Sequence, residues 1–188
     1  MSQTCASSIP DFCGAFDYCA PNFVFGEIEE IIIAQLYTES GDPFPDGWDW
    51  ELETSWDNFL AGCDDEANET IAFRIPVRAT IDEPERPEVE ASLYRKAFPP
   101  KRYTLSGSVD DLSQIAYDSM NELDGKRVRL WFRQGDYLFG SSSGLEADFT
   151  TWYTVEEGED SMSRMNFNAT WRGDAPDRIF SPWADTAS

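Results

Sequence analysis

Residues 71–82 read IAFRIPVRATID, and the alternation in this stretch decides the fold class. Apolar side chains recur at every second position from Ile71 to Ile81, and arginines, threonine and proline are among the residues between them. Successive side chains of a β-strand point to opposite faces, so a period of two predicts a half-buried strand. Because proline cannot donate a ladder hydrogen bond, Pro76 predicts that this strand lies at a sheet edge or contains a bulge.

A second alternating run, RVRLWFR at residues 127–133, places Arg127, Arg129 and Arg133 on one face of a predicted strand. Two interpretations of this arginine row remain open. The arginines either pair with acidic residues of the same chain, or they contact the acid-rich N-terminal region of a neighbouring subunit. The second interpretation predicts a head-to-tail contact that closes into a ring.

Five further strands are predicted from β-branched or alternating residues. They lie at about residues 28–37, 102–106, 136–139, 147–155 and 164–171. A helix is predicted from Val109 to Leu123, because Ser108 and Asp111 resemble a capping box and Gly125 follows as a stop. The sequence therefore predicts one domain over residues 1–188, mainly β with one helix: an antiparallel β-sandwich or barrel with a flanking helix and long loops.

Long segments without a predicted element separate these strands. Residues 1–25 are predicted to form an N-terminal arm, residues 38–70 a long loop, and residues 82–101, with four prolines, an extended excursion. A loop longer than about 12 to 15 residues is usually functional or disordered. The 38–70 loop contains Trp48, Trp50 and Trp56. These aromatic residues indicate that the loop is ordered by packing against a partner.

The charge is unusually large and uneven. The chain has 14 basic and 36 acidic residues, a net charge of −22. Residues 1–73 contain sixteen of the acids and no base, which gives −16, and the remainder carries −6. Such a surface disfavours nucleic acid or an anionic membrane as an adhesive partner. Adaptation to high salt is an alternative origin of the charge, supported by 3 Lys against 11 Arg, although it should spread acids over the whole surface.

The residues that usually support catalysis are scarce. The chain contains no histidine, phosphate-binding loop or nucleophile elbow, so we expect neither an enzyme nor a bound cofactor. Paired carboxylates beside the tryptophans leave a glycosidase as a remote alternative, and a monomeric carbohydrate-binding β-sandwich as the main alternative function.

No metal site is predicted, although two alternatives stay open. The acidic loop from Asp42 departs from the EF-hand pattern because Phe44 stands where an oxygen ligand is required, so only a different kind of calcium site would fit. The four cysteines, at positions 5, 13, 19 and 63, form no C-x-x-C pair, and buried thiols are expected rather than a disulfide or zinc site. With no signal-peptide pattern and no apolar run of about 18 residues, no membrane span is expected.

Three stretches together resemble the tail tube proteins of tailed viruses. These are CAPNFVFGEIEEIIIA at residues 19–34, LSGSVDDLSQIAYDSMNELDGKRVRLWF at residues 105–132, and MNFNATWRGDAP at residues 165–176. The likeness lies in the order of features along most of the chain and involves no invariant motif. A ring, stopper or terminator protein of the same fold family would give the same impression.

This resemblance implies a structural protein of the virus particle, located in the tail and assembled in the host cytoplasm. Its subunits would form homo-oligomeric rings, commonly hexamers, that stack into a tube and contact other tail proteins. An acidic lumen would let DNA pass without binding, because like charges repel over a Debye length of about 8 to 10 Å. The 1–25 arm and 38–70 loop would then make assembly contacts, with Arg127, Arg129, Arg133, Trp48, Trp50 and Trp56 as the predicted interface residues.

Overall fold

The fold is known from a computed structural model that describes residues 27–36, 44–45, 47–61, 72–86, 89–92, 95–97, 100–109, 114–154 and 164–184. These parts contain two helices and ten strands: β1 (Ile28–Gln35), α1 (Glu53–Ala61), β2 (Ala72–Ile81), β3 (Val89–Ser92), β4 (Arg95–Ala97), β5 (Lys101–Val109), α2 (Gln114–Leu123), β6 (Arg127–Gln134), β7 (Tyr137–Gly140), β8 (Leu145–Thr154), β9 (Arg164–Gly173) and β10 (Asp177–Phe180). The predicted 1–25 arm, the four cysteines, and residues 38–43, 46 and 62–70 of the predicted 38–70 loop lie outside the described residues.

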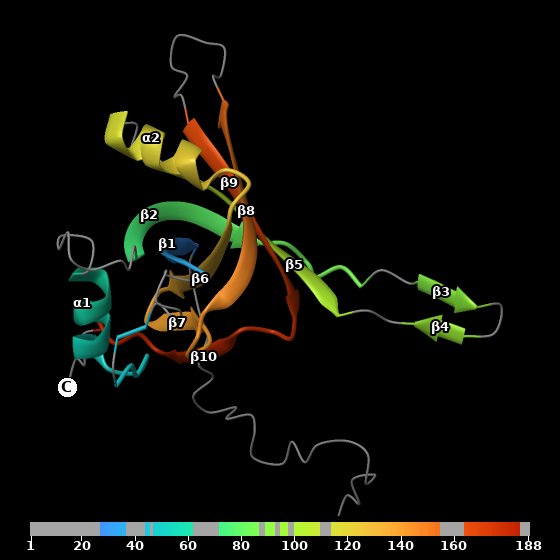
Figure 1. Cartoon of the computed structure of the whole chain (residues 1–188), viewed down its shortest axis with the longest axis horizontal. Helices are drawn as coiled ribbons and strands as arrows, with labels where there is room; N and C mark the ends of the chain where they lie inside the picture. Colours follow the sequence, from blue (N-terminus) through green and yellow to red (C-terminus); the bar gives the residue numbers. More distant parts are fainter. Residues whose placement is uncertain are drawn as a thin grey trace, which may run out of the picture.

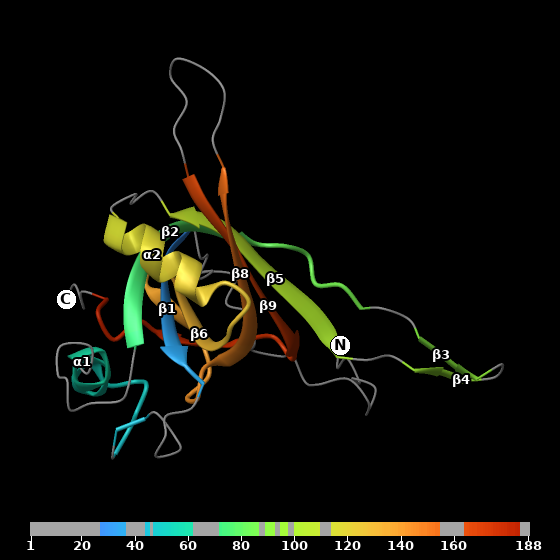
Figure 2. The same cartoon turned by 45° about the horizontal axis from the view of Figure 1, so that its top comes forward.

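Six antiparallel strands form a closed barrel. Their order is β1-β2-β5-β9-β8-β6, and the circle closes because β1 also pairs with β6, with Ile31 opposite Phe132. β7 pairs with β6, and β10 pairs with β7, so these two strands extend the sheet beyond the barrel. β3 and β4 form a separate two-stranded hairpin that lies well away from the barrel (Figures 1 and 2). The predicted fold class, a mainly β antiparallel sandwich or barrel with a flanking helix, is confirmed, and the barrel is the form observed.

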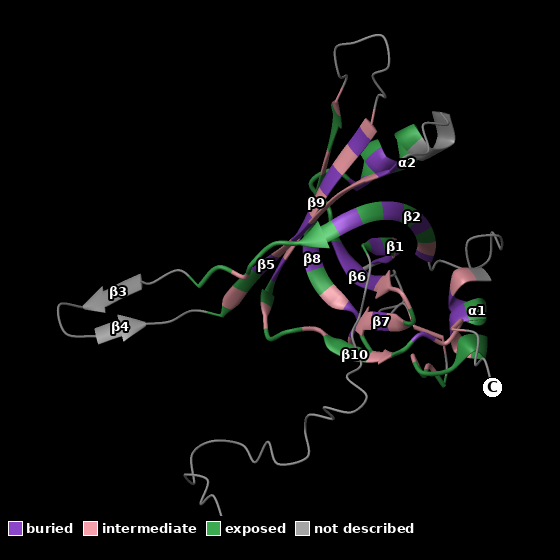
Figure 3. Ribbon diagram, turned by 180° about the vertical axis from the view of Figure 1, so that it is seen from behind, coloured by how far each residue is buried: buried purple, intermediate pink, exposed green. Residues whose placement is uncertain are grey.

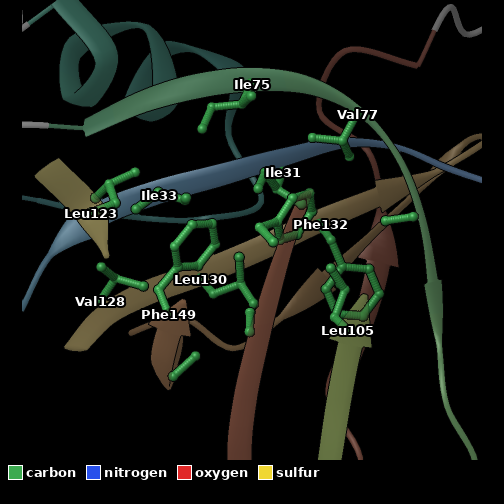
Figure 4. Packing of buried hydrophobic residues seen from close by; sticks show 14 of the residues in the cluster. Ile31, Ile33, Ile75, Val77, Leu105, Leu123, Val128, Leu130, Phe132 and Phe149 are labelled. Atoms are coloured by element: carbon green, nitrogen blue, oxygen red, sulfur yellow. The ribbon is translucent and has the colours of Figure 1, made fainter. Parts of the chain in front are cut away.

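The alternating strands place their apolar residues inside the barrel. Along β2, Ile75, Val77 and Ala79 are buried while Arg74, Pro76 and Arg78 are exposed, as the banded colours of Figure 3 show. Side chains from all six barrel strands and from α2 converge in the interior (Figure 4). The fully buried ones, those at or below 1% exposure, are Ile31, Ile33, Leu105, Leu130, Phe132, Ala147, Phe149, Met165, Phe167 and Ala169.

Pro76 lies next to the predicted irregularity. The register of β1 and β2 shifts between Ile28 and Glu30, because two steps along β1 correspond to three along β2, from Pro76 to Ala79. β2 pairs with β5 only from Arg78 onward, so the proline lies before that ladder begins. Pro76 thus has no β5 partner, and its pairing with β1 is irregular next to it, which agrees with the prediction of a sheet edge or a bulge.

The helix prediction requires two corrections. The helix after β5 begins at Gln114, whereas Ser108 and Val109 belong to the strand. Val109 is 2% exposed and pairs with Met165, so burial in the barrel outweighs the local capping pattern. The predicted end of the helix is correct, since α2 ends at Leu123 and Gly125 follows it with a φ of 71°. The second correction is α1, which occupies part of the segment predicted to be an irregular loop.

Three short strands also went unpredicted. The excursion at residues 82–101 contains the β3–β4 hairpin, and β10 follows β9 after a short turn. Each is at most four residues long, which leaves little room for a visible alternation.

Gly107 gives the barrel a point of close strand approach. A Cβ there would lie 2.6 Å from the Ala79 Cβ and 2.7 Å from the Arg78 carbonyl oxygen, so backbone would have to move. We expect Gly107→Ala to lower the free energy of unfolding by about 1 to 3 kcal/mol, the usual cost of overpacking. Chemical denaturation measures this. The matched control is Gly47→Ala, where a Cβ meets nothing within 4 Å, although its φ of 75° carries a smaller backbone cost. Equal losses in the two variants would contradict the steric explanation.

Candidate interaction surface on the outer barrel wall

A second apolar cluster covers the outside of the barrel where β1, β2 and β6 meet. Its centre is Trp131, which shares a strand with the predicted arginine row and is fully buried. The other buried members are Ile32, Ala34, Trp56, Phe59, Ala72 and Leu138, and Phe44, Trp48, Trp50, Leu60, Ile179 and Trp183 pack around them. The barrel therefore has apolar residues on both sides of β6, and the segment that contains α1 covers the outer side.

Aromatic rings make most of this outer cluster. The centroid of the Trp131 ring lies 5.2 Å from that of Trp56, 6.0 Å from Phe59 and 6.1 Å from Phe44, in edge-to-face arrangements. Such pairs are favourable because the positive edge of one ring meets the negative face of the other. Trp131 also donates a 2.8 Å hydrogen bond from Nε1 to the Ser141 carbonyl, so its polar atom is satisfied.

The three predicted interface tryptophans belong to this intramolecular cluster. Trp56 is 0% exposed and donates from Nε1 to the Trp50 carbonyl at 2.7 Å. Trp48 is half-buried and donates to the Ser142 carbonyl at 2.6 Å, which ties the segment to the β7–β8 turn. Trp56 therefore has no free surface to offer a neighbouring subunit in this conformation. The spacing of Trp56, Phe59 and Leu60, at i, i+3 and i+4, is the helical signal that sequence reasoning missed.

The predicted arginine row has partners within the chain. Arg127 pairs with Asp148 at 3.0 Å, and Arg133 with Glu29 at 3.4 Å. Arg129 is 8% exposed; it donates to the carbonyls of Leu36 and Ser143. Each of the three arginines thus has at least one partner in its own chain, although the buried Nε of Arg133 has no hydrogen-bond partner among the described residues.

Two cations of this wall are also held against aromatic rings. The Arg74 guanidinium lies 4.2 Å from the centre of the Trp183 ring and makes two hydrogen bonds to Glu30, at 3.0 and 2.9 Å. Arg129 lies 4.9 Å from the Phe44 ring. The structure thus brings Arg129 and the three tryptophans together and links Arg133 to the same wall through Glu30 at 3.9 Å. Arg127 pairs with Asp148 on β8 and is not part of this cluster.

An exposed acidic surface remains after the tryptophans are buried. Asp49, Glu51, Glu53 and Asp57, called the acidic ridge below, are all exposed on α1 and the turn before it. None of the basic side chains in the described residues forms an ion pair with them. Leu52 lies among them and is 52% exposed. This segment therefore presents exposed carboxylates around an exposed leucine.

A shallow polar hollow of about 660 Å³ lies on a different wall, across β5, β9, β8 and β6. Its lining includes Arg102, Arg172, Asn168, Thr170 and the Arg127–Asp148 pair. Among the described residues, no group of three or more His, Cys, Asp or Glu side chains is placed to hold a metal ion.

Comparisons with protein-family models, with curated proteins and with solved structures find no match to this chain. In the described residues, neither helix is long and apolar enough to cross a membrane.

Proposed function

We propose that this chain is a structural subunit of a viral tail, a tube or ring component that assembles with copies of itself. The observation that carries the proposal is the β3–β4 hairpin, which extends well away from the barrel (Figure 1). Among the described strands, β3 and β4 pair only with each other. An isolated two-stranded hairpin is at best marginally stable in water, so a partner surface is expected to hold it.

The charge supports the same proposal. A chain with a net charge of −22 repels other polyanions, and a wall of many such subunits repels them over the Debye length. DNA in a channel with this wall would find no site to bind, which suits passage of a genome. The tail assignment itself rests on the sequence resemblance, whereas the hairpin supports assembly in general.

The alternative function, a monomeric sugar-binding module, loses its main support. Such a module presents flat aromatic rings to solvent. Trp56 is buried and Trp48 and Trp50 are half-buried in the outer cluster, so these three rings form no open platform.

Sedimentation velocity and negative-stain microscopy of the purified full chain test the proposal. We expect rings or rods, and a sedimenting mass several times the 21.3 kDa of one chain. Discrete particles of the single-chain mass at every concentration would contradict it, and a measurable glycan affinity of such particles would favour the alternative.

A further inference from the structure

Charge is segregated along the hairpin in a way that suggests what it binds. Residues 91–109, which contain β4 and β5, include four basic residues and no acid, in a chain with 36 acids. These four, Arg95, Lys96, Lys101 and Arg102, are called the basic limb below. The limb is basic along the sequence, whereas in the strand pairing Lys96 lies opposite Glu90 and Arg102 opposite Glu85.

The root of the hairpin adds a fifth cation. Arg172 lies directly opposite Arg102 across the β5–β9 ladder, and both side chains are exposed. Like charges that face each other across two strands destabilise the pair. Glu85 faces Arg102 from the other side through backbone bonds of 2.9 and 2.8 Å, yet in the described residues neither guanidinium has an ion-pair or hydrogen-bond partner. An incoming carboxylate would relieve this repulsion.

The acidic ridge on α1 is the complementary surface. It presents exposed acids, and the first 73 residues contain no base that could neutralise them locally. The ridge and the hairpin lie on opposite sides of the barrel, with α1 at one end and β3–β4 at the other in both views (Figures 1 and 2). The basic limb of one chain therefore cannot reach its own ridge, but it can reach the ridge of a second copy.

We propose that the basic limb docks on the acidic ridge of a second copy of this chain. Two different patches meet in such a contact, so it is head-to-tail and repeats from copy to copy, closing into a ring where the rotation allows. Arginine forms bidentate bonds with carboxylates, and the exposed Leu52 supplies an apolar centre to the contact. This inference rests on the proposed function and specifies the surfaces through which the subunits meet.

Charge reversal of each patch tests the contact. The limb variant is Arg95→Glu with Lys96→Glu, and the ridge variant is Glu51→Lys with Asp57→Lys. We expect each variant alone to need at least about tenfold more protein to assemble, because the altered patch loses its net charge and the altered side chains repel the opposite patch. An equimolar mixture should restore assembly, because at the altered positions each limb then meets residues of opposite charge on the ridge. Sedimentation velocity at 0.15 M salt gives the readout.

The matched control is Lys126→Glu with Arg178→Glu, which changes the net charge as much as the limb variant at exposed positions outside both patches. It should assemble as the wild type does. Circular dichroism should show the same fold in all variants.

Each contrary outcome has a distinct meaning. A wild-type chain that stays monomeric at every concentration overturns both the docking and the proposed function. Normal assembly of the limb variant, or a mixture that fails to recover, overturns the docking alone. Wild-type binding to a duplex DNA oligonucleotide that the limb variant loses, with assembly unchanged, would make nucleic acid the partner and overturn the inference.

Discussion

Trp131→Ala should lower the free energy of unfolding by about 3 to 5 kcal/mol, the range for removing a buried tryptophan. Trp131 is 0% exposed and touches the aromatic rings that attach α1 to the barrel. The backbone is also fitted to this ring. A Cβ at Gly144, which has a φ of 75°, would lie 2.8 Å from it, and the Gly140 position is closer still. A side chain enclosed in this way leaves a cavity that cannot collapse.

Thermal and chemical denaturation measure this loss. For a domain of this size the melting temperature should fall by about 6 to 20 °C. Trp152→Ala is the matched control, because Trp152 is 46% exposed and its removal should cost under about 1 kcal/mol. If the two variants lost the same stability, the outer cluster would not be a second core, and the contacts of Trp131 would contribute little to the free energy of unfolding.

The barrel strands were largely predictable because their chemistry is local and periodic. Burial inside a barrel requires an apolar side chain at every second position, and β2 and β6 show this pattern over seven residues or more. The closure between β1 and β6 was not predictable in the same way. It joins residues about a hundred positions apart, and no property of either strand alone specifies that partner.

The outer cluster shows a second limit of sequence reasoning. Trp48, Trp50 and Trp56 stand among many acids, so the segment looked like a solvent-facing loop with aromatic contacts for a partner. The partner is the chain's own barrel, and the acids lie on the side of α1 that faces away from it. Sequence alone showed that the tryptophans needed a surface to bury against. Which chain supplies that surface depends on tertiary contacts.

The same ambiguity applied to the arginine row and has the same physical origin. Arg127 and Arg133 require anions, and acids on adjacent strands supply them once the register is fixed. By contrast, Arg102 and Arg172 share a register that opposes like charges. Sequence position gave no reason to separate these two arginines from the others, since the difference appears only in the β5–β9 pairing.

Trp56→Ala should lower the free energy of unfolding of the monomer by about 3 to 5 kcal/mol, which distinguishes a core residue from an assembly contact. Trp56 packs on Trp131 and lies 5.4 Å from Trp183, and its loss also leaves the Trp50 carbonyl without its donor. All of these contacts exist within one chain. The midpoint of urea denaturation should therefore already shift in dilute solution, where the chain is monomeric.

Leu52→Ala is the matched comparison, one position before α1 begins. Its side chain is 52% exposed, so stability should change by less than about 0.5 kcal/mol while assembly weakens. If Trp56 instead contacted a neighbouring copy, its variant would match the wild type in dilute solution and differ only where copies associate, because association stabilises by mass action. Loss of Trp56 should also weaken assembly indirectly, since α1 carries the acidic ridge and must be held on the barrel to present it.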